Sequence, residues 1–553
     1  MTPPWPPPWD HCDVATPDPC SGARIGSHTK CLAHLAPADR ATYLADLVPG
    51  ADINLCGTRI TAALLGQLLA AVRLDGRPRL GEVDFSHTDF PDGADFINVD
   101  FTGSNANFYL ASFAGLACFN GSLFTRGVNF HDTTFSEAVF LGMIVNGTAS
   151  FVGARFCGDA RLESVTCRHV LALSTAKFEG PARIDAAAER VTCQQTRWDA
   201  TASLTLRYAD LDLTGAIITQ PFAVSVSPFA RPAETAWFST RTPKVRVVSL
   251  AGTDTTHVLL TGMDLRSCRF AGAMHLDLLR LEGSTLFALP PTGVHWRRGV
   301  PRWWSQRRVL AEEHAWRALQ QPPVNPDAPT THEWQPGPHH TTHPARTPDP
   351  DVLAPLYRAL RKGSEDAKNK PDAADFYYGE MEMRRNDPTR PRGEHILLIL
   401  YWALSGYALR ASRALFWLIL AMTCSFFASS CGACPMLTPS HRSPADRPPS
   451  AKMSSSPSTT PTRRSPPVTA TASPGNAPRK PNASSSTASS SAPAARTSPP
   501  PEPMSKWARE SPSPSSSASP SSPCAAASSD DVWWQRLRPG GCPDPRDRVR
   551  HPA

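Results

Sequence analysis

The residues best suited to chemistry in this sequence are three cysteines and a histidine near its N-terminus. Cys12, Cys20, Cys31 and His34 have the spacing C-x7-C-x10-C-x2-H, within the stretch HCDVATPDPCSGARIGSHTKCLAHL. Thiolate sulfur and imidazole nitrogen are donors that zinc prefers, and three cysteines with one histidine can complete a tetrahedral site. A short, proline-rich segment with little core would become ordered on binding such a metal. The pattern therefore predicts a zinc site, with His28 as the alternative to His34.

The surroundings of these cysteines favour a metal over disulfide bonds. The N-terminal stretch MTPPWPPPWDHCD lacks the basic region and the following apolar region of a secretory signal peptide. We therefore expect this part of the chain in the cytoplasm, where thiols stay reduced. The alternative interpretation is that residues 1–35 are disordered and that their cysteines are unrelated to one another.

No motif for catalysis accompanies this set of residues. The sequence contains no G-x-S-x-G, no Walker A loop, no H-E-x-x-H and no G-x-G-x-x-G between a strand and a helix. The net charge of +7 over 553 residues is small for a dedicated nucleic-acid-binding protein. We therefore expect a protein that is not an enzyme, and we do not expect nucleic acid as its partner.

A phenylalanine repeat indicates the element that must hold the cysteine segment in place. In the stretch ADFINVDFTGSNANFYLASFAGLACF, residues 94–119, phenylalanine returns every five to seven residues. Neither the 3.6-residue period of an amphipathic helix nor the alternation of a half-buried strand gives this spacing. The residue two positions before each apolar centre is small or β-branched, except at Met143. These centres are Phe96, Phe101, Phe108, Phe113, Phe119, Phe124, Phe130, Phe135, Phe140, Val145, Phe151, Phe156 and Leu162.

The pairing of one small and one large residue predicts a coil of very short strands. Alternate residues of an extended segment share a face, so the centre and the residue two before it both point inward. A narrow interior has room for one large and one small group on each side, and successive coils stack at the spacing of paired strands. Each coil then contacts only its neighbours, and the two ends need caps. The sequence therefore predicts a mainly β solenoid.

This pattern resembles the pentapeptide-repeat family, whose motif is A-(D/N)-(L/F)-x-x. The match is most specific over residues 82–184, where the chain reads ADFIN, ANFYL, ASFAG and ARFCG, and a second block covers residues 258–283. The resemblance implies a right-handed quadrilateral β-helix, the pentapeptide-repeat solenoid, over residues 81–290. Residues 219–243 are rich in Pro, Ser and Thr and are predicted to be a loop inserted into it.

Helices are predicted at both ends of the solenoid. Residues 36–80 should form a helical N-terminal cap, because five apolar residues lie on one helical face: Leu64, Leu65, Leu68, Leu69 and Val72. Residues 291–320 are rich in tryptophan and arginine and are predicted to be a C-terminal capping helix. A membrane-surface anchor and a nucleic-acid patch of stacked rings and cations are the alternatives for this segment.

The C-terminal part of the sequence indicates a membrane anchor. A linker at 321–350 and a helical pair at 351–394 precede a membrane-proximal and transmembrane segment at 395–434. Residues 414–434 are 21 residues without a charge, which is long enough for one transmembrane helix. More arginine lies before this helix than after it, so the repeat domain is predicted to be cytoplasmic; the alternative is a buried hairpin in a soluble domain. Residues 435–553 are dominated by Ser, Pro, Thr and Ala and are predicted to be a disordered tail.

The membrane-proximal stretches carry a further resemblance. FYYGEMEMRR and LYWALSGYALRASRAL are similar to the corresponding part of bacterial, actinobacterial-type membrane-associated pentapeptide-repeat proteins, some of which carry an ion-channel-like module. This chain has one clear span and no T-V-G-Y-G filter. In this it departs from the channel type, and the one span predicts a single-pass protein of the cell membrane. We expect this protein to be a scaffold for an unknown protein partner and a candidate homo-oligomer. The regulatory part of an ion-channel-like module is the first alternative function.

A DNA mimic that binds a topoisomerase is the second alternative, because some pentapeptide-repeat proteins imitate the shape and charge of a duplex. Residues 80–185 hold 12 acidic and 6 basic residues, so the repeat is only mildly acidic. Such mimics are soluble, whereas this chain carries a predicted span. The membrane-tethered scaffold is therefore the function that we expect first.

Overall fold

The computed structural model describes residues 6–15, 19–227, 229, 231–292, 294–297, 300–321, 334–335, 337, 343 and 347–431. The chain divides into two units, Met1–Ala433 and Cys434–Ala553, and every element described below belongs to the first. The predicted disordered tail, 435–553, and most of the predicted linker, 321–350, lie outside the described residues.

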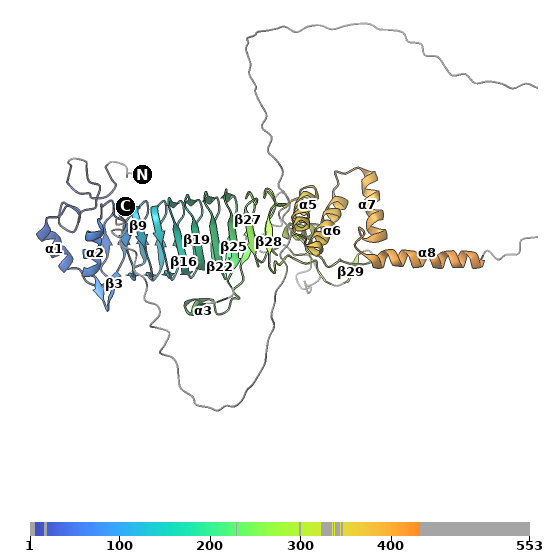
Figure 1. The fold of residues 1–553 in the computed structure, drawn as a ribbon, viewed down its shortest axis with the longest axis horizontal. Coiled ribbons are helices and arrows are strands. Elements are labelled where there is room, and N and C mark those ends of the chain that lie inside the picture. The colour runs from blue at the N-terminus through green and yellow to red at the C-terminus, as the bar shows by residue number, and fades with distance from the viewer. Residues whose placement is uncertain are drawn as a thin grey trace, which may run out of the picture. The chain divides into compact units, whose positions relative to one another are not determined.

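A parallel β-solenoid of about nine turns forms the middle of the first unit (Figure 1). Along one side, consecutive turns are joined by parallel pairing, for example Val83 with Ala106 and Leu171 with Val191. These partners are 23 and 20 residues apart in the chain, which is the length of one turn. The prediction of a mainly β solenoid is confirmed. The strands of this side form a nine-stranded sheet: β1 (Ile53–Asn54), β4 (Val83–Asp84), β8 (Asn105–Asn107), β11 (Gly127–Asn129), β14 (Ala149–Ser150), β17 (Val170–Ala172), β20 (Arg190–Thr192), β23 (Asp210–Asp212) and β26 (Arg246–Ser249).

The other strands of the solenoid belong to a second sheet. It begins with an antiparallel hairpin of β2 (Arg73–Leu74) and β3 (Arg77–Leu80). The remaining strands pair in parallel with those of neighbouring turns: β5 (Asp89–Phe90), β6 (Ala94–Asp95), β7 (Asp100–Phe101), β9 (Ser112–Cys118), β10 (Leu123–Phe124), β12 (Thr134–Val139), β13 (Ile144–Val145), β15 (Arg155–Phe156), β16 (Ala160–Cys167), β18 (Lys177–Phe178), β19 (Ala182–Ala187), β21 (Arg197–Trp198), β22 (Ala202–Arg207), β24 (Ile217–Ile218), β25 (Phe222–Val226), β27 (Val258–Thr261) and β28 (Arg280–Glu282).

The repeat centres point inward, as the sequence predicts. The centres from Phe96 to Leu162 are at most 2% exposed, and the residues two positions before them are at most 4% exposed. The aromatic rings stack turn upon turn in columns, and such stacking adds about 0.5–1.5 kcal/mol per pair beyond area burial. Ring centroids within a column are 4.1 to 5.2 Å apart in four series: Phe85–Phe108–Phe130–Phe151, Phe90–Phe113–Phe135–Phe156–Phe178–Trp198, Phe96–Phe119–Phe140 and Phe101–Phe124.

The turns between strands explain why Asp or Asn precedes many of the centres. The carboxylate of Asp95 accepts a hydrogen bond from the backbone N–H two residues further on, at 3.0 Å, and Asn129 does the same. Such Asx turns bend the chain sharply, and Asn98, just after the first of them, has a left-handed φ of 55°. Asn129 also donates to the side-chain oxygen of Asn107 in the turn below, at 3.0 Å. The polar residue therefore shapes the corner and links one turn to the next.

Two helices cover the N-terminal end of the solenoid. α1 (Pro37–Ala45) starts the cover, and α2 (Ala62–Ala71) is capped by Thr61, whose hydroxyl accepts from the N–H of Leu64 at 3.3 Å. The leucines of α2 that the sequence places on one face are buried in the same core as the first phenylalanines. They contribute an apolar plate over the first turn, which would otherwise expose its interior.

The inserted loop is shorter than the sequence predicts. The prediction places an insertion over residues 219–243, but β25 continues the second sheet between β22 and β27. Phe222 and Val224 are buried, so this strand fills the interior like any other. The insertion starts after Val226, contains α3 (Pro232–Phe238) and ends before β26. The prediction was wrong at its N-terminal boundary because the Ser-rich composition hides an alternating apolar pattern.

A buried ion pair fastens this insertion to the solenoid. Glu234 of α3 is 0% exposed and accepts from Nε of Arg207 on β22 at 2.9 Å. Arg207 also donates to Asp185 of the neighbouring β19 at 2.7 Å. A single buried guanidinium therefore joins two turns of the solenoid to the inserted helix.

The C-terminal end of the solenoid differs from the prediction of one capping helix over residues 291–320. The structure has an antiparallel hairpin of β29 (Val294–Arg297) and β30 (Val300–Trp303), followed by the shorter α4 (Ala311–Leu319). Pro301 explains the difference, because proline inside a helix removes a backbone hydrogen bond and clashes with the preceding turn. α4 therefore forms only part of the cap, and residues of two later helices, such as Leu353 and Phe376, belong to the same core as the solenoid.

A carboxylate of α4 closes the last turn. In successive turns the N–H of a column residue donates to a carbonyl of the next turn, as Leu250 does to Arg269 at 2.9 Å. At the last turn the N–H groups of Phe270 and Ala271 both donate instead to Oε1 of Glu312. Glu312 is 1% exposed. The Glu312 carboxylate therefore accepts the two hydrogen bonds that a further turn of the solenoid would otherwise accept.

Four further helices follow the solenoid. α5 (Pro350–Asp366) and α6 (Lys370–Asn386) pack as a pair against the last turns, where Phe376 contacts Phe287 with ring centroids 5.2 Å apart. α7 (Arg392–Ser405) comes next, and α8 (Ala411–Cys431) ends the described chain. Within α8, the 19 residues Ala411–Ser429 have a mean hydropathy of 1.6, which makes this helix long and apolar enough to cross a membrane.

Candidate metal centre

The predicted ligands lie on a loop segment that depends on the solenoid for its position. Apart from a short bridge between His11 and Ala23, the described residues before α1 form turns and loops. The N–H of Ala23 donates to the carbonyl of Cys56 at 2.7 Å, and the hydroxyl of Ser21 donates to the carbonyl of Gly57 at 3.0 Å. The segment is therefore attached to the first turn by hydrogen bonds to the backbone carbonyls of Cys56 and Gly57.

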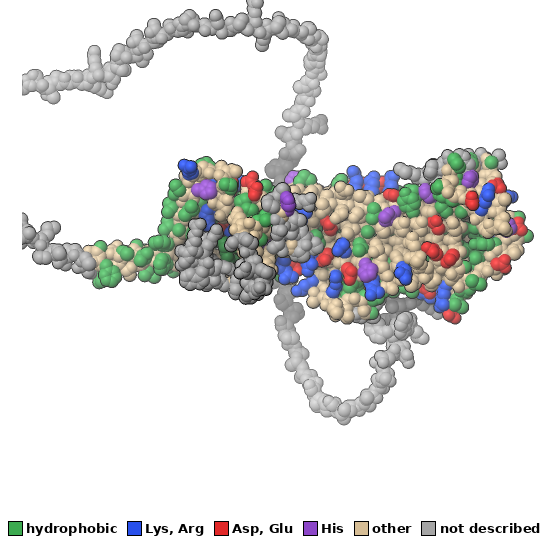
Figure 2. Space-filling model, turned by 180° about the vertical axis from the view of Figure 1, so that it is seen from behind, with side chains coloured by type: hydrophobic (Ala, Val, Ile, Leu, Met, Phe, Trp, Pro, Cys, Tyr) green, Lys and Arg blue, Asp and Glu red, His purple; other side chains and the backbone are tan. Residues whose placement is uncertain are grey.

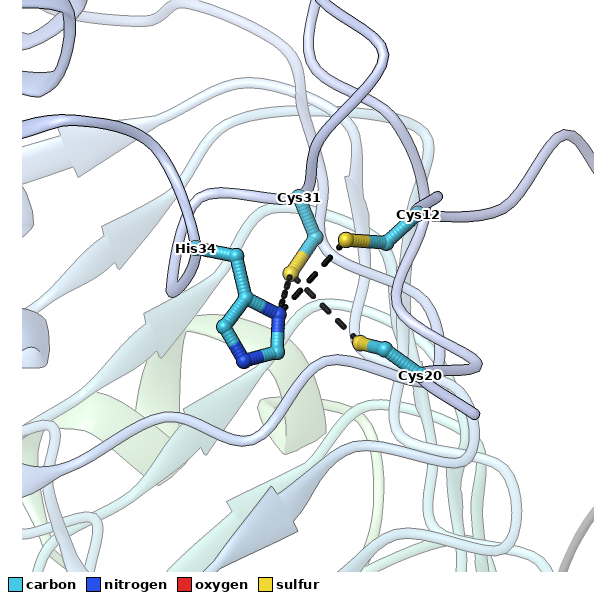
Figure 3. A group of neighbouring side chains, drawn as sticks. All are labelled: Cys12, Cys20, Cys31 and His34. Atoms are coloured by element: carbon cyan, nitrogen blue, oxygen red, sulfur yellow. Dashed lines mark hydrogen bonds between the residues drawn. The ribbon is translucent and has the colours of Figure 1, made fainter. Parts of the chain in front are cut away.

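The structure brings the four predicted ligands together. The sulfur atoms of Cys12, Cys20 and Cys31 and a ring nitrogen of His34 all lie within 4.8 Å of one another (Figure 3). Nδ1 of His34 is 3.5 Å from Sγ of Cys12 and 3.4 Å from Sγ of Cys31, and the sulfurs of Cys20 and Cys31 are 3.7 Å apart. The group contains His34, so the alternative ligand His28 is not needed.

These separations match the edges of a zinc tetrahedron. With zinc–sulfur bonds of about 2.3 Å and zinc–nitrogen bonds of about 2.0–2.1 Å, ideal edges are roughly 3.8 Å between two sulfurs and roughly 3.5 Å between sulfur and nitrogen. The three separations of 3.7, 3.5 and 3.4 Å fall close to these values. Three of the six donor separations therefore already fit a tetrahedron, and this donor set could bind a metal ion such as zinc.

Close packing holds the ligands in this arrangement. A Cβ atom on Gly22 would lie 2.8 Å from Cβ of Cys31 and 3.0 Å from the hydroxyl of Thr58, so glycine is needed there. Cys12 and Cys31 are buried, and Leu32 and Leu35 on either side of His34 belong to the main core. Because these packed neighbours fix the position of the backbone, the four donor atoms are held close together.

The electrostatics of the group favour an ionised thiol. The hydrogen bond with the Cys31 thiol is the largest cause that lowers the pKa of Cys20, and burial opposes it; the result is a pKa of about 5. The same hydrogen bond and burial raise the pKa of Cys31. The N–H of Gly22 also donates to the Cys20 sulfur at 3.4 Å. The hydrogen bond between the two sulfurs therefore favours ionisation of the Cys20 thiol, and a bound metal would displace the proton of Cys31.

Four protein ligands define what such a centre can do. A tetrahedral ion with four protein donors has no open position for water or substrate, which is the arrangement of structural rather than catalytic zinc. Here the ligands come from both ends of the segment between Cys12 and His34. A metal would join these ends to each other beside the first turn of the solenoid.

Two arginines of the Trp/Arg-rich segment, Arg307 and Arg317, are buried rather than presented on a surface. Arg307 is buried and donates to both oxygens of Glu313, at 2.6 and 2.7 Å, and Arg317 donates to Glu313 at 2.7 Å. The guanidinium of Arg317 also lies over the ring of Trp304, 4.7 Å from its centroid. These two arginines therefore stabilise the packing of α4, which fits the predicted cap better than a nucleic-acid patch.

Sequence reasoning missed Glu313, which is the centre of this buried network. The Tyr357 hydroxyl donates to it at 2.5 Å. Burial alone would raise the pKa of Glu313, but Arg307, Arg317 and the Tyr357 hydroxyl outweigh it and lower that pKa to about 2. The spacing of Glu313 and Arg317 indicates only an ordinary surface pair on a helix. Their burial depends on α5 and α6, which are distant in the sequence.

Together, the fold and the site define a parallel β-solenoid with a Cys3His group beside its first turn and an apolar helix at the end of the described chain. Comparison of the chain with protein-family models, with curated proteins and with solved structures found no match. Assignment to a family therefore depends on the repeat and its geometry.

Proposed function

We propose that this protein is a membrane-tethered scaffold of the pentapeptide-repeat type. The solenoid would present a stiff binding surface in the cytoplasm, and α8 would hold it at the cell membrane as a single span. The observation that carries the proposal is the exposure of α8. Of its apolar stretch Ala411–Ser429, 0% is buried, although it belongs to the same compact unit as the solenoid.

The family part of the proposal is supported by the length and filling of each turn. A turn of 20 residues, as between Leu171 and Val191, accommodates four units of five residues. The aromatic centres form four columns, as expected if each turn has four sides. We therefore propose the right-handed quadrilateral β-helix that the repeat implies.

The membrane part is supported by what α8 exposes. Leu418 is 56% and Phe426 is 71% exposed, and burying a side chain of this kind is worth about 1.5–3 kcal/mol. Residues 414–431 of α8 carry no charge, and at 1.5 Å per residue they extend about 27 Å, close to the hydrocarbon thickness of about 30 Å. A bilayer would therefore cover the helix along its whole apolar length.

The orientation follows from the positions of the arginines. Arg410 and Arg413 stand at the start of α8, and further arginines occur in α6 and α7. The side with more lysine and arginine stays in the cytoplasm. The solenoid would then be cytoplasmic and the chain beyond residue 434 would lie outside.

The charged surface of the solenoid favours a scaffold over a DNA mimic. Glu179 binds Lys177 at 2.6 Å and Arg155 of the previous turn at 2.8 Å, and Asp199 binds Arg197 at 2.8 Å. Because acidic side chains are paired with basic ones along the ladder, this face does not imitate the uniform charge of a duplex. No observation favours the channel-module alternative, which would need more than one span.

Topology is tested with reporters fused to the full chain. A reporter that is active only in the cytoplasm should work at the N-terminus and fail when it is placed after residue 440. An externally active reporter should give the opposite result at both positions. Cytoplasmic activity at both ends would contradict a single span.

The scaffold role is tested by cross-linking in intact membranes. A carboxylate-reactive reagent suits this solenoid, because many of its surface residues are acidic; Asp95 and Glu137, for example, are exposed. We expect a defined protein partner joined to solenoid residues, identified by mass spectrometry of the cross-linked peptides. Cross-links confined to the region after α6 would contradict a binding role for the solenoid.

A further inference from the structure

α7 carries a second apolar surface, separate from that of α8. From Ile396 to Ala403 its sequence is ILLILYWA, without a charge. Leu398 is buried in a cluster with Tyr378 and Met381 of α6. Five large aliphatic side chains of the same helix are 49% to 64% exposed: Ile396, Leu397, Ile399, Leu400 and Leu404.

The exposed and packed residues of α7 occupy opposite faces. At about 100° per residue, the five exposed side chains fall within an arc of roughly 160°. Leu398, Tyr401 and Trp402, which pack toward α6, fall within the remaining arc. A helix on the surface of a soluble protein normally turns a charged or polar face to water. α7 instead has an apolar face on each side, and only one of them is covered by the described protein.

The turn after α7 fixes the direction in which the chain leaves. Gly406, Tyr407 and Ala408 are all left-handed, with φ between 56° and 63°. Tyr407 is fully buried, and its hydroxyl donates to a carboxylate oxygen of Glu382 on α6 at 3.3 Å. Three consecutive residues in this strained region, held by a buried side chain, make a sharp corner between α7 and α8.

Two hydrogen bonds join α8 to the end of α7. Arg413 donates to the carbonyl of Trp402, and the indole N–H of Trp417 donates to the carbonyl of Ala403, both at 3.0 Å. In Figure 1, α6 lies on one side of α7, and α8 runs away across the other side. The exposed face of α7 is opposite α6, so it points in the direction in which α8 extends. Figure 2 shows hydrophobic side chains along the edge from which α8 emerges.

Arginines stand at both ends of the uncharged part of α7. Arg392 is exposed at its start and Arg410 follows its end. The guanidinium groups of Arg385 and Arg413 lie over the ring of Trp402, 4.4 and 4.7 Å from its centroid. An apolar face bordered by cations and tryptophan is the composition of helices that lie at a membrane surface.

We propose that the exposed face of α7 lies in the interfacial layer of the bilayer that α8 crosses. Acyl chains surround its five aliphatic side chains, and lipid phosphates pair with Arg392 and Arg410. The proposal rests on the span assigned to α8 under the proposed function. A helix that lies in the plane of the membrane contacts the bilayer along its whole length. α7 and α8 together would therefore fix the angle between the bilayer and the helices α5 and α6.

The test uses nitroxide labels on the full-length chain in vesicles of phosphatidylcholine and phosphatidylglycerol in a 3:1 ratio. The exposed Cys157 and Cys424 and the four cysteines beyond residue 430 are replaced by serine. Single labels are placed through Leu400→Cys on α7, Leu418→Cys on α8 and Val352→Cys on α5. Val352 is the matched control, since it is a 45% exposed aliphatic residue on a helix that we expect in water. Relaxation by oxygen, which enters lipid, is compared with relaxation by a water-soluble nickel chelate.

The expected result is a label at Leu400 that oxygen relaxes severalfold more than nickel does, with a depth between those of Val352 and Leu418. A Leu400 label as open to nickel as the Val352 label overturns the proposal, while a deep Leu418 label leaves the single span intact. A Leu400 label shielded from both reagents also overturns it, because a second copy or a protein partner then covers α7. A Leu418 label that nickel relaxes would contradict the proposed membrane span of α8, and the proposal for α7, which rests on that span, would fail with it.

Discussion

Cys20 and Phe130 contribute to this protein through different properties of a side chain. Cys20 provides a donor atom that only a few other residues could replace, at 3.7 Å from the sulfur of Cys31. Phe130 provides shape, with its ring stacked between Phe108 and Phe151 at 4.9 Å on each side. Cys20 is therefore tested by the metal content of the protein, and Phe130 by the stability of the solenoid.

Cys20→Ser should remove the metal. The wild-type chain, purified under reducing conditions without chelator, should contain about one zinc ion, because four donors complete a structural site. Serine is a poor zinc ligand, so the variant should contain close to none by elemental analysis. Cys157→Ser is the matched control, since Cys157 is an exposed cysteine outside the group, and it should keep its zinc. A wild-type protein without zinc would end the assignment.

Phe130→Asp should unfold part of the solenoid. Loss of the ring costs about 3–5 kcal/mol, and an unpaired buried carboxylate adds to this, so the change approaches the net stability of a domain. Limited proteolysis of the variant should cut near residue 130 at concentrations of protease that leave the wild type intact. Thr125→Asp introduces the same carboxylate at an exposed corner and should have little effect. Equal resistance of the wild type and Phe130→Asp would show that the ring is not needed inside the solenoid.

At the scale of the element, the ends of the solenoid need more than apolar plates. A turn at the end has backbone N–H groups with no following turn, and buried N–H groups without a partner are costly. At the C-terminal end, Glu312 supplies the acceptor for two of them from α4. At the N-terminal end, α2 covers the interior with leucines. The C-terminal cap therefore satisfies backbone N–H groups, whereas the N-terminal cap covers apolar side chains.

Glu312→Ala should loosen the last turn of the solenoid. Two buried N–H groups would lose their acceptor, at a cost of about 1–3 kcal/mol each if water does not replace it. Hydrogen exchange at Phe270 and Ala271 should accelerate, whereas exchange in the middle turns should not change. Glu312→Gln keeps an oxygen in the same place and should show a smaller effect. Unchanged exchange in Glu312→Ala would mean that another group satisfies these amides.

At the scale of the whole molecule, the solenoid divides the protein into regions that are stabilised independently. Each turn contacts only the turns beside it, so a loss at one end need not spread to the other. The Cys3His group acts on the N-terminal turns and the network around Glu313 acts on the C-terminal helices. In the proposals made above, α8 provides the membrane span and α7 lies at the membrane surface beside it.

Leu418→Arg should detach the protein from the membrane. A charge near the middle of a span costs about 2.5–3.5 kcal/mol on insertion scales, and α8 already contains polar Thr423, Ser425 and Ser429. The wild type should resist extraction by alkaline carbonate, while a larger share of the variant should be released. Leu289→Arg changes an exposed leucine in the segment after β28 and should leave extraction unchanged. Release of the wild type itself by carbonate would remove the membrane from the proposed function.

The sequence by itself determined the solenoid and the apolar helix, because both depend on local periodicity. A side chain every fifth residue marks the inner face of a coil wherever that coil lies, and the centres from Phe96 to Leu162 are indeed buried. The high mean hydropathy of α8 is likewise a property of adjacent residues. The predictions for 219–243 and 291–320 were wrong because the overall composition of each segment concealed a single feature: an alternating strand in the first, and in the second a proline that is incompatible with a helix.

Only the tertiary structure decided which distant residues meet. The donor types of Cys12, Cys20, Cys31 and His34 suggested zinc, but their spacing does not specify a tetrahedron, which depends on how loops pack around Gly22. Glu312 and Glu313 resemble surface residues in the sequence, yet one caps a turn and the other holds two arginines. The two faces of α7 are equally apolar in the sequence, and the position of α6 alone leaves one of them uncovered. In each case the cause is contact with residues that are distant in the sequence, which a local sequence pattern does not predict.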